Sequence, residues 1–559
     1  MNDRSYTEAE IQDLTDRVFL LKERLEAGKI HFAPHLIEDF RRSFEAIRLR
    51  PDGKVDPRTV DGRIRASTLA IVAMNQREEM KNSATLQDLQ EKYFEFLFEQ
   101  FGWLYDQMVQ HKVPSYVIAE HFAKEAEFVD KLFSVIPDCE KAVKDFWEVA
   151  GEISEYHLQD GHQLKSVFSG DLCPSYDENV VSTAGLYVDT IILPCPVLRV
   201  APLGNFLPKS EVVKLFVKHV LTVMTYRNLA TADVSPPIVL IVPSRDDIQG
   251  RGSEHSVTAR AAPLMVQHGN RLFGRSFQEL DELTEFCSGL VGVEDVVSQL
   301  KCPERLLFDT EWGGDATHQL RTAMTENPVL PGMDQDVAGH QVITAALGRM
   351  PQAMAAEEAA FQFGGSPLIS APTSWSYYTW LLEYQGARAR NRAGNIEACH
   401  VAHALTTEAG TSLQWLGNVP PESVLEIRRN GLAEELRGVL SSGLSDLLKV
   451  NPENYFRTAD QVVENLDLAF RKHQQDLLEA KRRKLKLYGI DVPTCLAVGA
   501  IGVAGAMTGS IPLQGISAAL SVVGLATLKD IKTKYVEIAE ADKVRRTSPT
   551  GILFRHLAN

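Results

Sequence analysis

The chain lacks the short motifs that mark common classes of enzyme. It contains no GxSxG turn, no HExxH pair, no GxGxxG loop after a strand and no phosphate-binding P-loop. Nothing in the sequence therefore names a reaction or a cofactor. Active sites also form without such signatures, so catalysis is left open, but the sequence favours a protein that is not an enzyme.

Cysteine is scarce and scattered. The seven cysteines include no CxxC pair, so we predict neither a disulfide framework nor a zinc ribbon, and a reducing compartment fits best. The N-terminal stretch is polar and acidic, and we expect no secretory signal. No run of about 18 strongly apolar residues lacks a glycine or proline break, so an ordinary membrane span is not predicted. The expected location is the cytoplasm, with peripheral contact at the inner face of the membrane left open.

The composition is that of a folded protein with an excess of acid. Hydrophobic residues make up 44% and charged residues 24% of the 559 positions, and this length predicts several domains. The formal net charge of −16 argues against general nucleic-acid binding, because affinity for phosphate comes from clustered lysine and arginine.

Residues 1–150 are predicted to form an N-terminal helical domain. Thr7 and Glu10 have the spacing of a capping box, and an apolar stripe at alternating steps of three and four residues follows: Ile11, Leu14, Val18, Leu21 and Leu25. Gly28 should end this helix. The many aromatic residues between Tyr93 and Tyr105 predict a helix at the centre of a bundle, and core packing is favoured over a ligand-stacking surface.

Residues 151–327 are predicted to form an α/β domain. The β-branched runs at 187–200 and 238–242 are typical of short buried strands, and the residues from Val212 to Met224 have helical spacing. A strand–helix–strand order predicts that the two strands lie parallel and side by side. The pattern then returns to helix in a third domain, 328–480. The whole predicts a predominantly helical α+β protein, with a small α/β element in the middle and a glycine-rich C-terminal helical hairpin.

The C-terminal part, 481–559, contains the most unusual segment, a run without charge from Val492 to Leu528. Its two apolar halves, 492–507 and 516–528, would be about 24 Å and 20 Å long as helices, shorter than the roughly 30 Å of a bilayer's hydrocarbon. Basic residues flank both sides: Lys481, Arg482, Arg483, Lys484 and Lys486 before the run, and Lys529, Lys532 and Lys534 after it. The positive-inside rule then keeps both ends in the cytoplasm, which predicts a shallow hairpin.

Glycines in this run are spaced for close helix packing. Gly499, Gly502, Gly505 and Gly509 fall on one helical face. Each costs about 1 kcal/mol relative to alanine in a helix in water, so packing, lipid or oligomerisation must hold the segment. A hairpin buried in protein and a membrane-active or oligomer-forming hairpin both stay open, whereas a phosphate loop is disfavoured because the lysine of a P-loop is missing. The basic, apolar tail from Arg545 to Leu557 is expected to dock on the protein.

Two polar groupings are candidates for chemistry. Asp309, Glu311, Asp315 and His318 could bind a divalent metal or transfer protons, although an acidic loop before a helix N-terminus explains them more simply. His400 and His403 share a predicted helical face near Glu397 and Cys399, but metal-binding bundles of this kind need a second such motif, and the sequence has none.

The layout resembles that of bacterial effectors in which a large sensing body controls a short hydrophobic element, as in anti-phage defence. This resemblance implies a non-enzymatic sensor, effector or assembly subunit whose hairpin associates with membrane or with another protein chain. Two alternatives remain: a soluble scaffold subunit of a multiprotein complex, and a metal-dependent hydrolase or nuclease centred on Asp309, Glu311 and His318.

Overall fold

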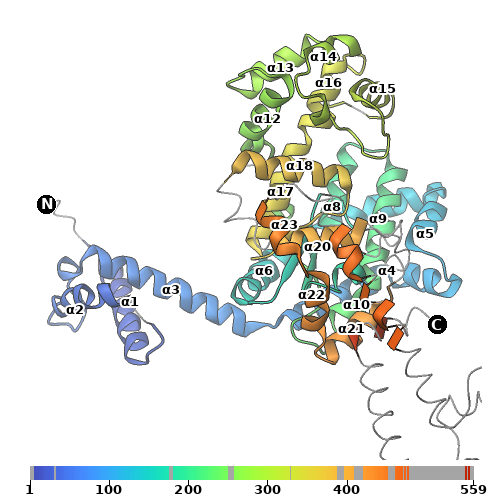
Figure 1. Ribbon diagram of the computed structural model, residues 1–559. Helices are drawn as coiled ribbons and strands as arrows, with labels where there is room; N and C mark the ends of the chain where they lie inside the picture. The colour runs from blue at the N-terminus through green and yellow to red at the C-terminus, as the bar shows by residue number, and fades with distance from the viewer. Residues whose placement is uncertain are drawn as a thin grey trace, which may run out of the picture. The chain divides into compact units, whose positions relative to one another are not determined.

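The computed structural model describes residues 6–476, except 31–32, 171, 175–179, 250–256, 328, 331, 387–395, 408–418, 451–459, 467, 470 and 474, together with 548–549 and 552–553 (Figure 1). The glycine-rich hairpin with Gly499, Gly502, Gly505 and Gly509, and the basic flank from Lys481 to Lys486, lie outside these residues. The described chain is predominantly helical, with a small parallel sheet, as predicted.

Contacts divide the chain into two compact units. The first comprises residues 1–89 and 152–160, and the second comprises 90–151 and 161–559. These limits differ from the sequence boundaries at 150 and 327. Helix α6 (Ala126–Asp160) continues through 150 because apolar residues such as Trp147 and Ile153 recur on it without a break. The sheet also takes a strand from beyond 327.

The first unit is built on three helices, α1 (Glu8–Glu26), α2 (Ile37–Glu45) and α3 (Gly62–Ser83). The capping box of α1 is confirmed: Glu10 N donates to Thr7 Oγ1 (3.2 Å) and Thr7 N donates to Glu10 Oε2 (2.8 Å). The stripe from Ile11 to Leu21 is buried, and Gly28, with φ of +66°, follows the end of the helix. Local sequence therefore determines this helix.

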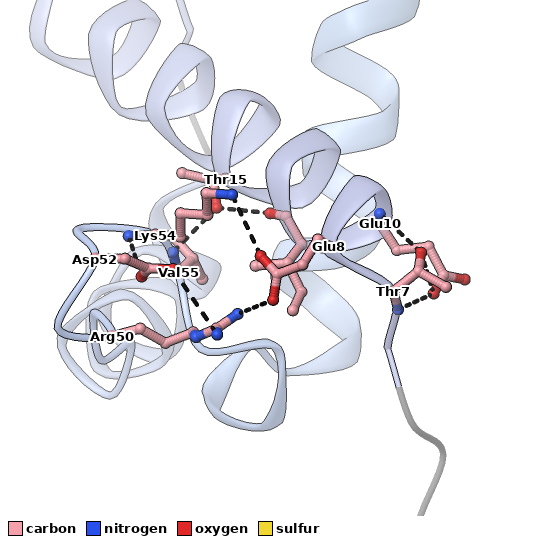
Figure 2. A network of polar contacts seen from close by, with 9 residues as sticks. Thr7, Glu8, Glu10, Thr15, Arg50, Asp52, Lys54 and Val55 are labelled. Atoms are coloured by element: carbon pink, nitrogen blue, oxygen red, sulfur yellow. Dashed lines mark hydrogen bonds and ion pairs between the residues drawn. The ribbon is translucent and has the colours of Figure 1, made fainter.

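A network of hydrogen bonds and ion pairs connects the loop at residues 50–55, which precedes α3, to helix α1 (Figure 2). Glu8 accepts from Arg50 Nη1 (3.1 Å) and Lys54 Nζ (3.3 Å). Thr15 Oγ1 donates to Ile11 O (2.6 Å) and accepts from the amide of Val55 (3.0 Å), a residue that is fully buried. The loop, although polar in sequence, thus adds an apolar side chain to the core of this unit.

In the second unit, aromatic residues of α4 (Leu86–His111) form much of the local core. Tyr93 and Phe94 are buried, and the Tyr93 ring lies 5.2 Å from that of Trp147 on α6. Trp103, by contrast, is 51% exposed and contacts Phe122 of α5 (Ser115–Phe122) edge to face. Core packing is therefore the main role of these aromatics, as predicted.

The sheet has the order β3-β2-β1-β4, and all neighbours are parallel. Its strands are β1 (Lys165–Phe168), β2 (Thr190–Leu193), β3 (Val239–Ile241) and β4 (Ser366–Leu368). The predicted side-by-side arrangement of β2 and β3, joined through α9 (Lys209–Thr225), is confirmed. β2 is shorter than the predicted strand at 187–200, because Pro194 and Pro196 offer no amide to a ladder and Pro196 begins α8 (Pro196–Val200).

The remaining elements of the second unit are mainly helices around this sheet. Those near the first three strands are α7 (Val180–Ala184), α10 (Arg227–Ala230) and α11 (Arg245–Gln249). A helical insertion between β3 and β4 contains α12 (Val257–Phe273), α13 (Leu280–Ser288), α14 (Val293–Gln299), α15 (Ala316–Glu326), α16 (Ala338–Gln341), the π-helix η5 (Val342–Leu347) and α17 (Arg349–Gln362). After β4 come α18 (Pro372–Gln385), α20 (Ile396–Thr407), α21 (Pro421–Arg429), α22 (Ala433–Leu440) and α23 (Leu444–Val450). Figure 1 shows α12–α16 gathered at one end of this unit, and their hydrophobic core continues into α17, α18 and α20 through residues such as Met350, Trp375 and Cys399.

Both sequence neighbours of the glycine-rich segment are held in the second unit. In the helical residues 460–466, Val462 and Leu466 are buried, and Ile552 and Leu553 of the tail are also fully buried. At these described positions the tail is buried in the protein, as expected. Within the described residues, no helix has the length and apolar character needed to cross a membrane.

Candidate functional site

The carboxyl edge of the parallel sheet is the place where the fold would accept a ligand. The chain runs from β1 to β2 to β3 in one direction and then returns to the other side of β1 to form β4. In open α/β sheets, ligands bind beyond the carboxyl ends of the strands at such a reversal of strand order. In this sheet, that position lies beyond the ends of β1 and β4.

The loop after β1 is closely packed against the start of α18. Gly170 has φ of +92°, and a Cβ there would lie 3.2 Å from atoms of both Ile369 and Ser374. Ser374 Oγ donates to Gly170 O (3.2 Å), which joins the two chain segments that leave β1 and β4. The strand ends at this position are thus bridged by the protein's own side chains.

A largely buried ion pair connects the helices that follow β2 and β3. Arg199 Nε lies 2.9 Å from Asp247 Oδ1, with side-chain exposures of 16% and 9%. The other oxygen of Asp247 accepts from the amide (3.1 Å) and hydroxyl (2.9 Å) of Ser244, which caps α11. The carboxylate is therefore fully engaged in holding α8 and α11 together.

Two thiols near this pair are protonated rather than reactive. Cys195 Sγ lies 3.1 Å from Tyr93 Oη, and burial raises the pKa of Cys195 to about 11 although the Tyr93 hydrogen bond opposes the rise. Burial also raises the pKa of Cys173 strongly, against the opposing charge of Arg199. Because the thiolate is the nucleophile, neither group is prepared for covalent catalysis at neutral pH. All cysteines in the described part of the chain are free.

The histidine pair predicted on α20 lies beside β4. His403 Nδ1 donates to Ile369 O (2.5 Å), and its ring stacks on Trp375 at 4.2 Å. His400 meets the same indole edge to face, whereas Glu397 Oε1 accepts from Tyr187 Oη (2.9 Å). The two histidine rings thus share one packing partner, Trp375, whereas Glu397 contacts Tyr187.

The acidic candidates form turns and a helix cap. Asp309 Oδ1 accepts from the amide of Glu311 (2.8 Å), and Asp315 Oδ1 accepts from the amide of His318 (2.9 Å) at the start of α15. Across the residues that the structure describes, no three His, Cys, Asp or Glu side chains are grouped so that they could hold a metal ion. The interpretation of Asp315 as part of a helix N-terminus agrees with this geometry.

Sequence reasoning missed Arg199 and Asp247. The available signal was the spacing from Ser244 to Asp247 directly after an apolar run, which is that of a capping box and indicates a helix start after a strand. Its partner Arg199 could not be identified from spacing, since it lies in a different strand–helix connection. Comparison of the chain with protein-family models, curated proteins and solved structures gives no match.

Buried histidines should make the protein sensitive to mild acid. Burial lowers the pKa of His268 and His219 to about 4 and that of His403 to about 3. In the unfolded chain the value is about 6.5, so below that pH the unfolded state binds more protons than the folded state. The stability that these neutral rings contribute is therefore complete above pH 6.5 and is lost as the pH falls toward 4.

We expect the melting temperature to fall between pH 7.5 and 5.5, and His268→Gln to make this slope shallower. His268 Nε2 donates to Arg305 O (3.2 Å) and Nδ1 accepts from Tyr384 Oη (2.8 Å), contacts that suit a neutral ring. Thermal unfolding across this pH range measures the effect, with the exposed His111→Gln as control. Equal slopes for His268→Gln and the wild type would contradict the assignment.

Proposed function

We propose that the protein is a non-enzymatic effector that associates with an anionic membrane surface through its glycine-rich C-terminal segment. The observation that carries this proposal is the charge-free run from Val492 to Leu528 with basic residues on both sides. Lysine and arginine near an anionic bilayer contribute about 1 kcal/mol each, and a short apolar hairpin adds burial in the interface. A sensing body combined with such a segment is also the layout expected of an anti-phage effector.

The burial of residues on both sides of the glycine-rich C-terminal segment supports a shallow hairpin. Leu466 precedes it and Ile552 and Leu553 follow it, and all three side chains are fully buried in the same unit. Since both of these described ends belong to one unit, the proposal places the two basic flanks on the same side of a membrane. This agrees with the positive-inside rule for a shallow hairpin.

Vesicle flotation tests the proposal with the full chain. Vesicles of phosphatidylglycerol and phosphatidylethanolamine should carry the wild type upward, and Gly502→Leu should lose most of this association because the bulky side chain blocks the close-packed glycine face. Gly62→Leu is the matched control: its position at the start of α3 is exposed, and a Cβ there meets nothing within 4 Å.

The proposal fails if the wild type remains in the vesicle-free fraction. Measurement of the molecular mass of both proteins without lipid tests whether the segment serves self-association instead. The segment serves self-association if two results are obtained together: the wild type is oligomeric and Gly502→Leu is monomeric, and neither protein floats with the vesicles.

A further inference from the structure

A buried carboxylate joins the sheet to the helices that lead toward the C-terminal segment. Asp189 lies directly before β2, and its Oδ2 accepts from the amide of Leu164 (2.8 Å). Its Oδ1 is bound by two guanidinium groups, Arg428 of α21 and Arg437 of α22. The side chains of Asp189, Arg428 and Arg437 are 13%, 8% and 14% exposed, so these charges are largely shielded from water.

The same two arginines also bind backbone carbonyls of the loop before β2. Arg437 Nε donates to Tyr187 O (2.6 Å), and Arg428 Nη2 donates to Val188 O. Helices α21 and α22 are therefore fixed to the sheet by polar contacts that converge on the carboxylate of Asp189. Removal of this one anion would leave the Arg428 guanidinium without a carboxylate partner and Arg437 with only the exposed Glu434, which is strongly unfavourable.

The second joint lies between α22 and the helical residues 460–466. Asn465 Nδ2 donates to Leu440 O (3.2 Å) and to Ser442 O (2.9 Å). The last carbonyls of a helix have no partner within it, so the Asn465 amide closes the end of α22. The base of the C-terminal segment is thereby connected to Asp189 through consecutive hydrogen-bonded elements.

We infer that α21, α22 and residues 460–466 form a clamp that holds the base of the glycine-rich segment against the body and limits its association with membrane. This inference rests on the proposed function and names its regulation. The clamp consists of two polar joints, at Asp189 and at Asn465, and each joint can be weakened without a change in the segment itself. Weakening either joint is expected to loosen residues 460–466, which precede the segment.

Two variants weaken the clamp at different joints. Asp189→Asn keeps the shape of the side chain but removes its charge, and Asn465→Asp removes both donated hydrogen bonds at the far end. Glu434→Gln is the matched control, because Glu434 also pairs with Arg437 but is 84% exposed. Loss of one partner of a buried pair should raise hydrogen-exchange rates of amides in α21 and α22 by roughly a hundredfold in Asp189→Asn.

Hydrogen exchange and flotation on the same vesicles then decide the inference. It predicts that Asp189→Asn and Asn465→Asp increase exchange in 421–466, leave exchange in the first unit unchanged, and float more completely than the wild type and Glu434→Gln. If exchange rises but flotation stays at the level of the wild type while Gly502→Leu abolishes it, the clamp is overturned and the membrane function stands. If exchange in 421–466 stays unchanged in both variants, the clamp is overturned as well. If no protein floats, the proposed function fails and the regulation fails with it.

Discussion

Replacing Asp247 with alanine should lower the free energy of unfolding by about 3–5 kcal/mol, the usual cost of removing one partner of a buried ion pair. Arg199 would lose its carboxylate within a site where its side chain is only 16% exposed. Ser244 would also lose the acceptor for its amide and hydroxyl. Thermal and urea unfolding measure the change.

The adjacent Asp246→Ala is a suitable control for this prediction. Asp246 pairs with Arg260 where the two side chains are 41% and 36% exposed, so its loss should cost less than about 1 kcal/mol. The double variant Arg199→Met with Asp247→Leu removes both charges and should recover much of the lost stability. Equal melting temperatures for Asp247→Ala and Asp246→Ala would contradict the structural role of the pair.

Replacing Gln90 with leucine should destabilise the second unit by about 2–5 kcal/mol, since two buried backbone groups would lose their partners. The amide of Ile241 donates to Gln90 Oε1 (2.8 Å), and Gln90 Nε2 donates to Ile241 O (3.0 Å). β3 lies at one edge of the sheet, so the fully buried Gln90 side chain pairs with it as a neighbouring strand would.

The control for this prediction lies on the same helix. Gln110 is exposed near the end of α4, and Gln110→Leu should leave the free energy of unfolding within about 0.5 kcal/mol. Hydrogen exchange at Ile241 adds a local readout, because its amide should lose protection in Gln90→Leu. Unchanged protection at Ile241 together with unchanged stability would show that Gln90 does not close this edge.

Local patterns in the sequence predicted much of the fold. The box formed by Thr7 and Glu10, the stripe after it and the stop near Gly28 depend on residues within one or two turns of each other. The parallel pair β2 and β3 followed from two apolar runs with one helix between them. By contrast, β1 and β4 were missed, because their sequences, KSVF and SPL, contain no run of β-branched apolar residues. Their pairing also joins distant parts of the chain, with Ser166 opposite Ser366.

The sequence by itself determined the helical character of the protein, the start of its first helix and the parallel placement of two strands, because hydrogen bonds and apolar periodicity within a segment encode these features. It also specified the unusual composition of the C-terminal segment. Only the tertiary structure decided the strand order, the pairing of Arg199 with Asp247 and the convergence of Arg428 and Arg437 on Asp189. Such buried charges are stable only when folding brings their partners together from distant segments, so no local spacing records them.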